Sequence, residues 1–312
     1  MRLCAVSVDL DEIPNYHAIH GLPAPQSPGA TAVHDVALDR LDALAERAGL
    51  PLTLFAVGAS LSREQSAQSL RRMADHGHEI ANHSLDHFYD LTRRTADEMR
   101  RQIEHGADVI ERAVGRRPIG FRSPGYVITD ELMDVLIASG HKYDSSVFPC
   151  PAYFATKAAK LTMIAVRGRR SRSVQDHPRV LLSPTRPYRP GKPYYRQGDL
   201  PLIELPVQVT RGARLPYIGT TLTLSGSRTA SLLTKMVLGE PVINLELHGM
   251  DVLDSRDGLQ ALIGHQPDVD IDHGRKVNVL EGVFAQIRKS GYRFVTLQQA
   301  ATEVERALSS QP

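Results

Sequence analysis

Residues 78–87 read HEIANHSLDH, and the predicted fold is built outward from this stretch. A short apolar centre at Ile80 and Ala81 indicates a strand, and two histidines, His83 and His87, follow it four residues apart. If a helical turn follows the strand, residues at i and i+4 share a face, so both imidazoles could reach one metal ion. Because the chain contains 13 histidines, this pair alone does not separate a metal site from two solvated loop histidines.

Length and composition indicate a globular protein of enzyme size. The chain has 312 residues, of which 42% are hydrophobic and 23% charged, and its net charge of +2 demands no nucleic-acid partner. No apolar run approaches the ~18 residues of a membrane span. Cys4 and Cys150 are too few for a disulfide framework, and residues 1–9 indicate a strand and not a signal peptide. We therefore expect a cytoplasmic protein with no integral membrane segment.

Apolar runs alternate with helical patterns along the chain. Capping boxes at Ser62 and Thr95 and a cap at Thr129 predict helix starts, and Gly49 predicts a helix end. This rhythm predicts parallel strands covered by helices in an α/β fold. Besides residues 78–87, the expected strands are residues 3–9, 52–57, 119–121, 142–145, 202–209, 242–248 and 294–297.

Two segments depart from this rhythm. Residues 12–33 are rich in Pro and Gly and predict a long loop, with His17, His20 and the nearby His34 expected in solvent or in a lid. Residues 151–200 show no helical period and predict a basic, Pro-rich insertion. The insertion could be an exposed segment kept in solution by its charge, or a cap that meets an anionic substrate or a membrane surface. Among the basic residues it contains are Arg167, Arg169, Arg170, Arg172, Arg179, Arg186, Arg189, Lys192 and Arg196.

Residue types suited to catalysis follow several of the predicted strands. Residues 242–248 alternate, so that Asn244, Glu246 and His248 share a polar face. In barrels and open α/β sheets, functional groups gather at the carboxyl ends of the strands. The groups expected to meet there are Asp9, Asp11, His83, His87, Arg122 and His248.

These motifs together resemble the polysaccharide deacetylase family, also called NodB-homology proteins or carbohydrate esterase family four. The resemblance covers roughly residues 1–150 and 200–300, and it implies a single-domain, distorted or incomplete (β/α)7-type barrel over residues 1–312. Val8-Asp9-Leu10-Asp11 is similar to a split form of the first motif, which implies that Asp9 is the catalytic base and Asp11 a metal ligand.

The remaining motifs extend the resemblance. The second motif is similar to residues 83–87, which implies that His83 and His87 are metal ligands. Arg122-Ser123-Pro124 is similar to the third motif, and His248 to the histidine of the last. The resemblance implies one divalent ion, with zinc as the default and cobalt or nickel as alternatives. It also implies that Arg122 orients Asp9 and that His248 protonates the leaving amine.

The chain departs from the family in the residues around this set. It contains no tryptophan, so the tryptophan motif of the family is missing, and Asp144 and Asp251 are the two stand-ins for the acid that tunes His248. Residues 143–149 and Glu204 are more similar to a branch near exopolysaccharide genes and to cyclic-amide hydrolases. Residues expected to line or support the site are Pro124, Tyr126, Asp144, Glu204 and Asp251.

The expected activity is hydrolysis of an N-acetyl group on an amino sugar or sugar conjugate, which could be lipid-linked or anionic. Two alternatives stay open: a deformylase or cyclic-amide hydrolase with the same chemistry, and a non-catalytic sugar-binding module. A place at the inner membrane face and an oligomeric state are open as well.

Overall fold

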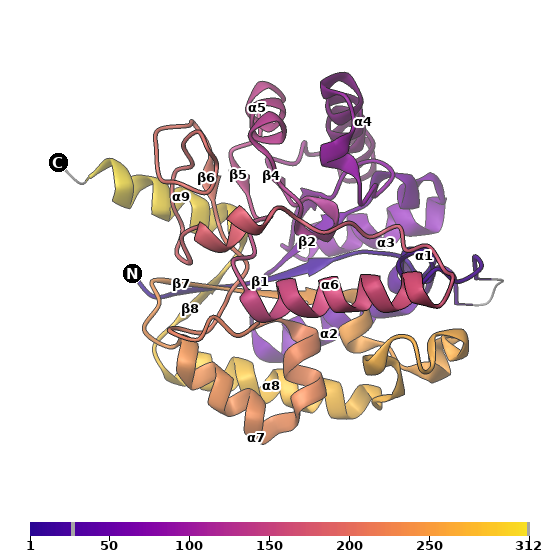
Figure 1. Ribbon diagram of the computed structural model, residues 1–312. Helices are drawn as coiled ribbons and strands as arrows, with labels where there is room; N and C mark the ends of the chain where they lie inside the picture. Colours follow the sequence, from indigo (N-terminus) through magenta and orange to yellow (C-terminus); the bar gives the residue numbers. More distant parts are fainter. Residues whose placement is uncertain (26–28, 311–312) are drawn as a thin grey trace.

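A parallel sheet forms the centre of the structure, a computed structural model that describes residues 1–25 and 29–310 (Figure 1). In these residues the strands pair in the order β6-β5-β4-β3-β2-β1-β7, and β8 pairs with β1. Residues 3–5 of β1 pair with β8 and residues 6–9 with β2, so these two strands share one edge of β1. The strands are β1 (Leu3–Asp9), β2 (Leu52–Ala56), β3 (Glu79–Asn82), β4 (Gly120–Phe121), β5 (Tyr143–Asp144), β6 (Ile203–Glu204), β7 (Val242–His248) and β8 (Arg293–Val295).

The sheet curls into an incomplete (β/α)7-type barrel, which confirms the predicted fold class. Its ends approach each other beyond β6, where the backbone N–H of Gln208 donates to the carbonyl of Asn244 in β7 over 3.1 Å. The side-chain amide of Asn244 also donates to the carbonyls of Leu205 and Pro206. A few contacts to one buried asparagine therefore join the two ends of the sheet.

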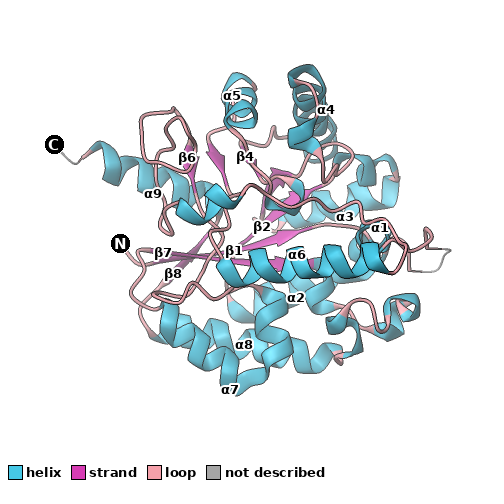
Figure 2. Ribbon diagram, in the orientation of Figure 1, coloured by secondary structure: helices cyan, strands magenta, loops and turns pink. Residues whose placement is uncertain are grey.

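Helices cover the outside of the barrel in two groups. In Figure 2, α2, α7 and α8 lie on one side of the sheet, and α4 and α5 lie on the other. Apolar residues of α2, α3, α7 and α8 pack on the outward side chains of β1 and β7 in the largest hydrophobic cluster. The helices are α1 (Ile13–His20), α2 (Leu38–Ala48), α3 (Glu64–Asp75), α4 (Ala96–Val114), α5 (Asp130–Ala138), α6 (Pro151–Val166), α7 (Gly219–Val237), α8 (His273–Lys289) and α9 (Leu297–Ser309).

The two ends of the barrel interior differ in polarity. At the amino-terminal end of the strands, Leu3, Ala5 and Val242 belong to an apolar cluster that includes the first residues of α9. Because successive strand residues point to opposite faces, Ser7 and Asp9 continue the inward row that Leu3 and Ala5 begin. In β1 and β7 the inward row is therefore apolar at the amino-terminal end and polar from Ser7 and Asn244 onward.

The segment after β1 is not the long loop that residues 12–33 predict. Residues 13–20 form α1, whose N-cap Glu12 accepts a hydrogen bond from the Ile13 amide and whose first turn contains Pro14. Gly21 ends the helix with a φ of 63°. Eight residues are too few for a periodic signal, and the Pro-Gly content of the segment hid the helix. The expectation for residues 26–28 lies outside the described residues.

The prediction that residues 151–200 lack a helix is wrong for their first third, which forms α6. Pro151 occupies the first turn, where its missing N–H costs nothing, and the alanines of residues 152–165 favour a helix. One side of α6 faces a cavity and the other faces solvent, so no single apolar stripe marks it. In Figure 1, α6 crosses in front of the sheet, and just beyond it the Arg172 amide donates to the Ala18 carbonyl of α1 over 3.1 Å.

Two of the three predicted helix caps are confirmed, and one is wrong. The capping box at Thr95 and the cap at Thr129 are confirmed. The capping box at Ser62 is wrong, because the Ser62 hydroxyl donates to the Ala59 carbonyl and α3 starts after Arg63 without a side-chain cap. The strand expected at residues 202–209 is limited to β6. In the part of the chain that the structure describes, no helix is long and apolar enough to cross a membrane.

Candidate metal centre and active site

The pairing of β1 with β7 brings Asp9 and His248 together. In this parallel pair Asp9 lies opposite His248, and Ser7 lies opposite Glu246. All four side chains belong to the inward row of their strand. Asp9 is only 2% exposed. The last two inward positions of each strand therefore place two carboxylates, a hydroxyl and an imidazole at one point of the barrel.

Asp11, His83 and His87 form a compact group beside Asp9. The Oδ1 atom of Asp11 lies 3.2 Å from Nε2 of His83 and 3.0 Å from Nε2 of His87, and the two Nε2 atoms are 3.1 Å apart. All three residues are buried. Ligand atoms at such separations can surround one ion with bonds of ~2.0–2.2 Å. The group therefore fits a single divalent cation.

The two histidines reach this group from a turn and not from the helical turn that their spacing suggested. The strand ends at Asn82 as expected, but Ser84 and His87 have φ angles of 67° and 53°. The Asn82 side chain accepts from the Ser84 amide, and the Ser84 hydroxyl accepts from the His87 amide. Short polar side chains of this kind compete with the helical hydrogen bonds of the backbone.

Hydrogen bonding fixes the tautomer of His83 in the form that a metal requires. Its Nδ1 lies 2.7 Å from the carbonyl oxygen of Arg122, which can only accept a hydrogen bond. Nδ1 therefore carries the proton, and in the neutral ring the Nε2 lone pair faces Asp11 and His87. Metal-binding histidines commonly donate their other N–H to a carbonyl in this way.

The same group can hold a proton when it holds no cation. Burial disfavours the charged form of His83, but the carboxylates of Asp9 and Asp11 raise the pKa of His83 above its ordinary value. The Oδ1 atom of Asp11 is buried and has no hydrogen-bond partner among the described residues. A divalent cation would compete with the proton for these atoms, so binding should weaken at low pH.

Arg122 is fully buried and holds Asp9 in place. Its Nη1 donates to Oδ1 of Asp9 over 2.6 Å, and its Nη2 donates to the hydroxyls of Ser7 and Ser145 over 2.9 and 2.8 Å. Its Nε donates to the Ser145 carbonyl, and the guanidinium lies 4.2 Å from the centre of the Phe55 ring. Such a network orients the Asp9 carboxylate, whose Oδ2 stays 3.8 Å from Nε2 of His83.

His248 pairs with Glu246, a residue that the sequence did not single out for this task. Its Nδ1 lies 2.8 Å from a carboxylate oxygen of Glu246, which is fully buried. Burial would lower the pKa of His248, but the negative charge of the adjacent Glu246 carboxylate raises it well above its ordinary value, with smaller effects from Asp9 and Asp11. The other ring nitrogen, Nε2, lies 3.4 Å from the Tyr126 hydroxyl. The alternation of residues 242–248 was the signal that could have identified Glu246.

The two acids expected to tune His248 lie elsewhere. Asp251 accepts a hydrogen bond from the backbone N–H of His248 over 2.8 Å, so it fixes the strand end and not the ring. Asp144 pairs with Glu204 across β5 and β6, on the outward row of these strands. The Asp144 carboxylate accepts from Ser146, and Glu204 accepts from the Val147 amide. Asp144 and Glu204 therefore support the loop that follows β5.

Pro124 and Tyr126 lie in the segment that follows β4, close to His248. Pro124 starts a short 3-10 turn two residues after Arg122. This turn places the Tyr126 hydroxyl 3.4 Å from Nε2 of His248. His17, His20 and His34 are all buried, so the expectation that they lie in solvent is wrong, while their place in a lid stays a prediction. The three rings contact the Pro23 carbonyl, the Gln266 side chain and the Glu12 carboxylate respectively.

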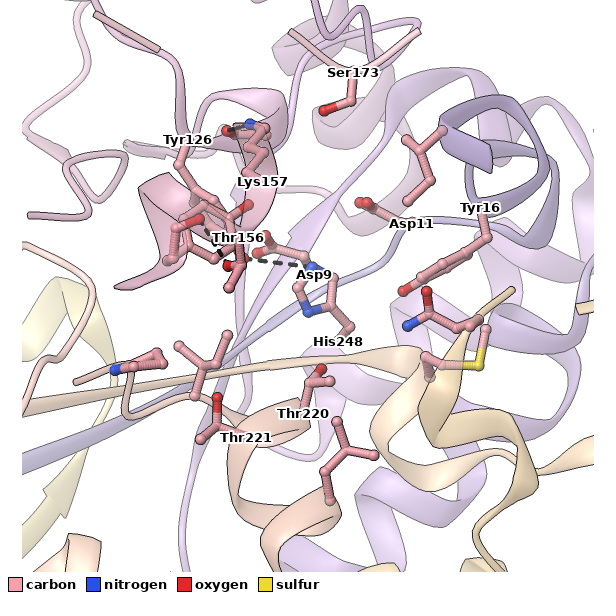
Figure 3. Close-up of a pocket in the computed structure, with 18 of the residues that line it drawn as sticks. Asp9, Asp11, Tyr16, Tyr126, Thr156, Lys157, Ser173, Thr220, Thr221 and His248 are labelled. Atoms are coloured by element: carbon pink, nitrogen blue, oxygen red, sulfur yellow. Dashed lines mark hydrogen bonds between the residues drawn. The ribbon is translucent and has the colours of Figure 1, made fainter. Parts of the chain in front are cut away.

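A cavity of about 430 Å³, here called the catalytic cavity, opens onto these groups. Figure 3 shows Asp9 and His248 near its centre, with Tyr16 and Lys157 on opposite sides of them. Its volume is that of a small-molecule site. Tyr16, Tyr153 and Lys157 had no signal in the sequence, because α1 and α6 were not predicted. Four tyrosines contribute to its wall: Tyr16, Tyr89, Tyr126 and Tyr153.

Comparison with known proteins relates part of this chain, including His83, His87 and Arg122, to one family. The model of the polysaccharide deacetylase family matches residues 32–143, which include β2, β3 and β4. A peptidoglycan deacetylase of Helicobacter pylori is 27% identical over 148 residues, or 46% of this chain and 49% of that protein. The chain therefore matches about half the length of this curated relative.

Solved structures share the fold over nearly the whole chain. A provisionally named polysaccharide deacetylase from Mycobacterium smegmatis aligns with a TM-score of 0.61 at 18% identity, covering all of this chain and 93% of that one. An activity-restored variant of a Bacillus anthracis pseudoenzyme of carbohydrate esterase family four aligns with a TM-score of 0.51 at 11% identity. That alignment covers 96% of this chain and 67% of that one. At these identities the likeness shows the fold alone.

Proposed function

Because the match over residues 32–143 confirms the resemblance to polysaccharide deacetylases, we propose that residues 1–312 act as one metal-dependent N-deacetylase domain. The observation that carries this proposal is the convergence of Asp11, His83 and His87 at separations of 3.0–3.2 Å beside the pair of Asp9 and His248. The proposed substrate is an N-acetylated amino sugar or sugar conjugate.

The proposed cofactor is one divalent ion held by Asp11, His83 and His87. Zinc is the first choice for one carboxylate and two imidazoles, and cobalt or nickel suits the same ligands. When bound, such an ion polarises the amide carbonyl and lowers the pKa of water.

Asp9 and His248 are proposed to move the protons. Asp9 accepts the proton of the attacking water, because its Oδ2 faces the ligand group while Arg122 binds its Oδ1. His248 donates a proton to the leaving nitrogen, since Glu246 stabilises its protonated form. Tyr126, within 3.4 Å of Nε2 of His248, can orient the ring or the leaving group. The products are an amine and a short carboxylic acid.

The proposal is tested by measuring acid release from a panel of N-acetyl and N-formyl amino sugars. The protein is loaded with zinc, cobalt or nickel, and Asp9→Asn serves as the inactive control. Metal-dependent release of acetate supports the proposal. Release of formate alone identifies a deformylase with the same site, and binding of a sugar without release of either acid identifies a non-catalytic module.

A further inference from the structure

A second cavity continues the catalytic cavity along α6. This outer cavity of about 260 Å³ shares five lining residues with the catalytic cavity and adds others farther along the helix. The shared residues are Ile19, Tyr153, Thr156, Lys157 and Ser173. A substrate whose amide lies at the metal centre can therefore extend a second group into the outer cavity.

The outer cavity is lined by two lysines from one face of α6. Lys157 and Lys160 are three residues apart, so their side chains are neighbours on the helix surface. Lys157 borders both cavities and also lies 5.8 Å from the centre of the Tyr153 ring. Of the five described residues that line both cavities, Lys157 is the only one with a cationic side chain.

Lys157 lacks a close anionic partner. Its ammonium group donates one hydrogen bond, to the Gly125 carbonyl over 2.9 Å, although it has three N–H donors. In residues 1–25 and 29–310, no carboxylate lies within the 4.0 Å that defines an ion pair with it. Asp176 attracts it from farther away, but burial raises the pKa of Asp176 to about 7, which reduces its negative charge near neutral pH.

Lys157 is half-buried, and removing part of its charge from water carries a cost that a ligand can offset. Desolvation lowers the pKa of Lys157 to about 8, so the group stays mostly protonated at neutral pH while its charge is poorly compensated. An anionic group in the outer cavity would supply the missing counter-charge and accept the free donors.

We infer, building on the proposed function, that the substrate carries a carboxylate or phosphate which binds Lys157 in the outer cavity. The proposed substrate class is thus an anionic N-acyl amino sugar and not a neutral one. Lys160 lies at the same cavity and adds positive charge farther from the metal centre.

The test compares three N-acetyl compounds: neutral N-acetylglucosamine, N-acetylmuramic acid with its carboxylate, and N-acetylglucosamine 1-phosphate. Lys157→Met removes the charge and keeps an apolar stem, and Lys157→Arg keeps the charge. Lys289→Met, at an exposed position of α8, is the matched control. Thermal unfolding of each variant checks that the fold is intact.

We expect Lys157→Met to raise KM for the anionic compounds by roughly 10- to 100-fold, because a hydrogen bond to a charged group is lost. KM for the neutral compound should rise far less than KM for the two anionic compounds, and Lys157→Arg should retain the preference for an anionic substrate. The better of the two anionic compounds tells whether carboxylate or phosphate is the natural group. Equal changes in KM for neutral and anionic compounds, or no preference in the wild type, would overturn the inference.

Failure of the deacetylase proposal can be distinguished from failure of the inference about Lys157. If no compound releases acetate, the deacetylase proposal is contradicted, and calorimetric binding of the same compounds to the metal-loaded protein decides the role of Lys157. Binding that favours the anionic compounds and is lost in Lys157→Met supports the inference. Binding that ignores the charge of the compound overturns it.

Discussion

The Nδ1 atom of His248 lies 2.8 Å from a carboxylate oxygen of Glu246, two residues earlier on the same face of β7. The protonated imidazole is therefore stabilised by a buried carboxylate, and the pKa of His248 lies well above its ordinary value. A general acid must be protonated, so activity should persist through neutral pH and fall as pH rises through this raised pKa.

Glu246→Gln should move that alkaline limb to lower pH. Burial already disfavours the charged imidazole, and the amide removes the largest influence that raises the pKa of His248. The profile of kcat/KM against pH checks this shift, because it reports groups of the free enzyme. An ion on Asp11 would weaken one of the smaller contributions and leave that of Glu246. An alkaline limb that does not move in Glu246→Gln would show that Glu246 does not tune His248.

Asp9 and Asp11 are chemically alike, but their contacts predict different losses. Asp9→Asn should retain the metal, because Asp11 and both histidines remain, and should lose turnover by ~10²–10⁴-fold, because an amide accepts no proton. Asp11→Asn should weaken metal binding itself, since a neutral amide is a poor substitute for a carboxylate ligand. Turnover and bound metal are measured on the same preparations. A metal-free Asp9→Asn protein beside a metal-replete Asp11→Asn protein would reverse the two roles.

The packing of β4 against β5 gives a prediction about stability. A Cβ atom added to Gly120 would lie 1.9 Å from the Tyr143 ring, whose hydroxyl passes over β4 and donates to Glu79 in β3. Gly120→Ala should destabilise the fold by about 1–3 kcal/mol or more, through overpacking.

Gly282 in α8 is the matched control for this substitution. A Cβ atom there meets nothing within 4 Å, so Gly282→Ala should stabilise the protein by roughly 0.5–1 kcal/mol. Denaturant unfolding of both variants measures the two free energies. A Gly120→Ala protein as stable as the wild type would mean that the Tyr143 ring does not cross Gly120.

Four arginines follow α6, and their exposure predicts a dependence on salt. Arg167, Arg169, Arg170 and Arg172 are exposed, and in the described part of the chain none of them forms an ion pair within 4.0 Å. If they attract an anionic substrate, kcat/KM for that substrate should fall as salt is added, because screening weakens exposed charges. The neutral N-acetylglucosamine should show no such fall. Equal salt sensitivity for both substrates would leave these arginines without a role in substrate attraction.

The fold and the polar centre were predictable because their signals are local. Alternation along residues 242–248 and the acids after residues 3–9 identify inward positions at strand ends, and the parallel sheet brings such ends together. The structure accordingly places Asp9 opposite His248.

The part of the cavity wall that α1 and α6 contribute was not predictable, for a physical reason. α1 is too short for a helical period. α6 has a cavity on one side and solvent on the other, so it shows no single apolar stripe. The resemblance pointed to Asp144 and Asp251 as partners of His248, whereas the observed partner, Glu246, is the inward neighbour at i−2 on the same strand. The cytoplasmic location and the single domain stay predictions.

The central claim is that Asp11, His83 and His87 hold one catalytic divalent ion, and elemental analysis of bound metal tests it most directly. The wild type and His105→Ala, an exposed histidine of α4 that serves as control, should each retain one ion per chain after dialysis. His83→Ala should lose the ion, because only two of the three protein ligands, Asp11 and His87, remain. The hydrogen bond from His83 Nδ1 to the Arg122 carbonyl is lost as well. Undiminished metal in His83→Ala would contradict the account.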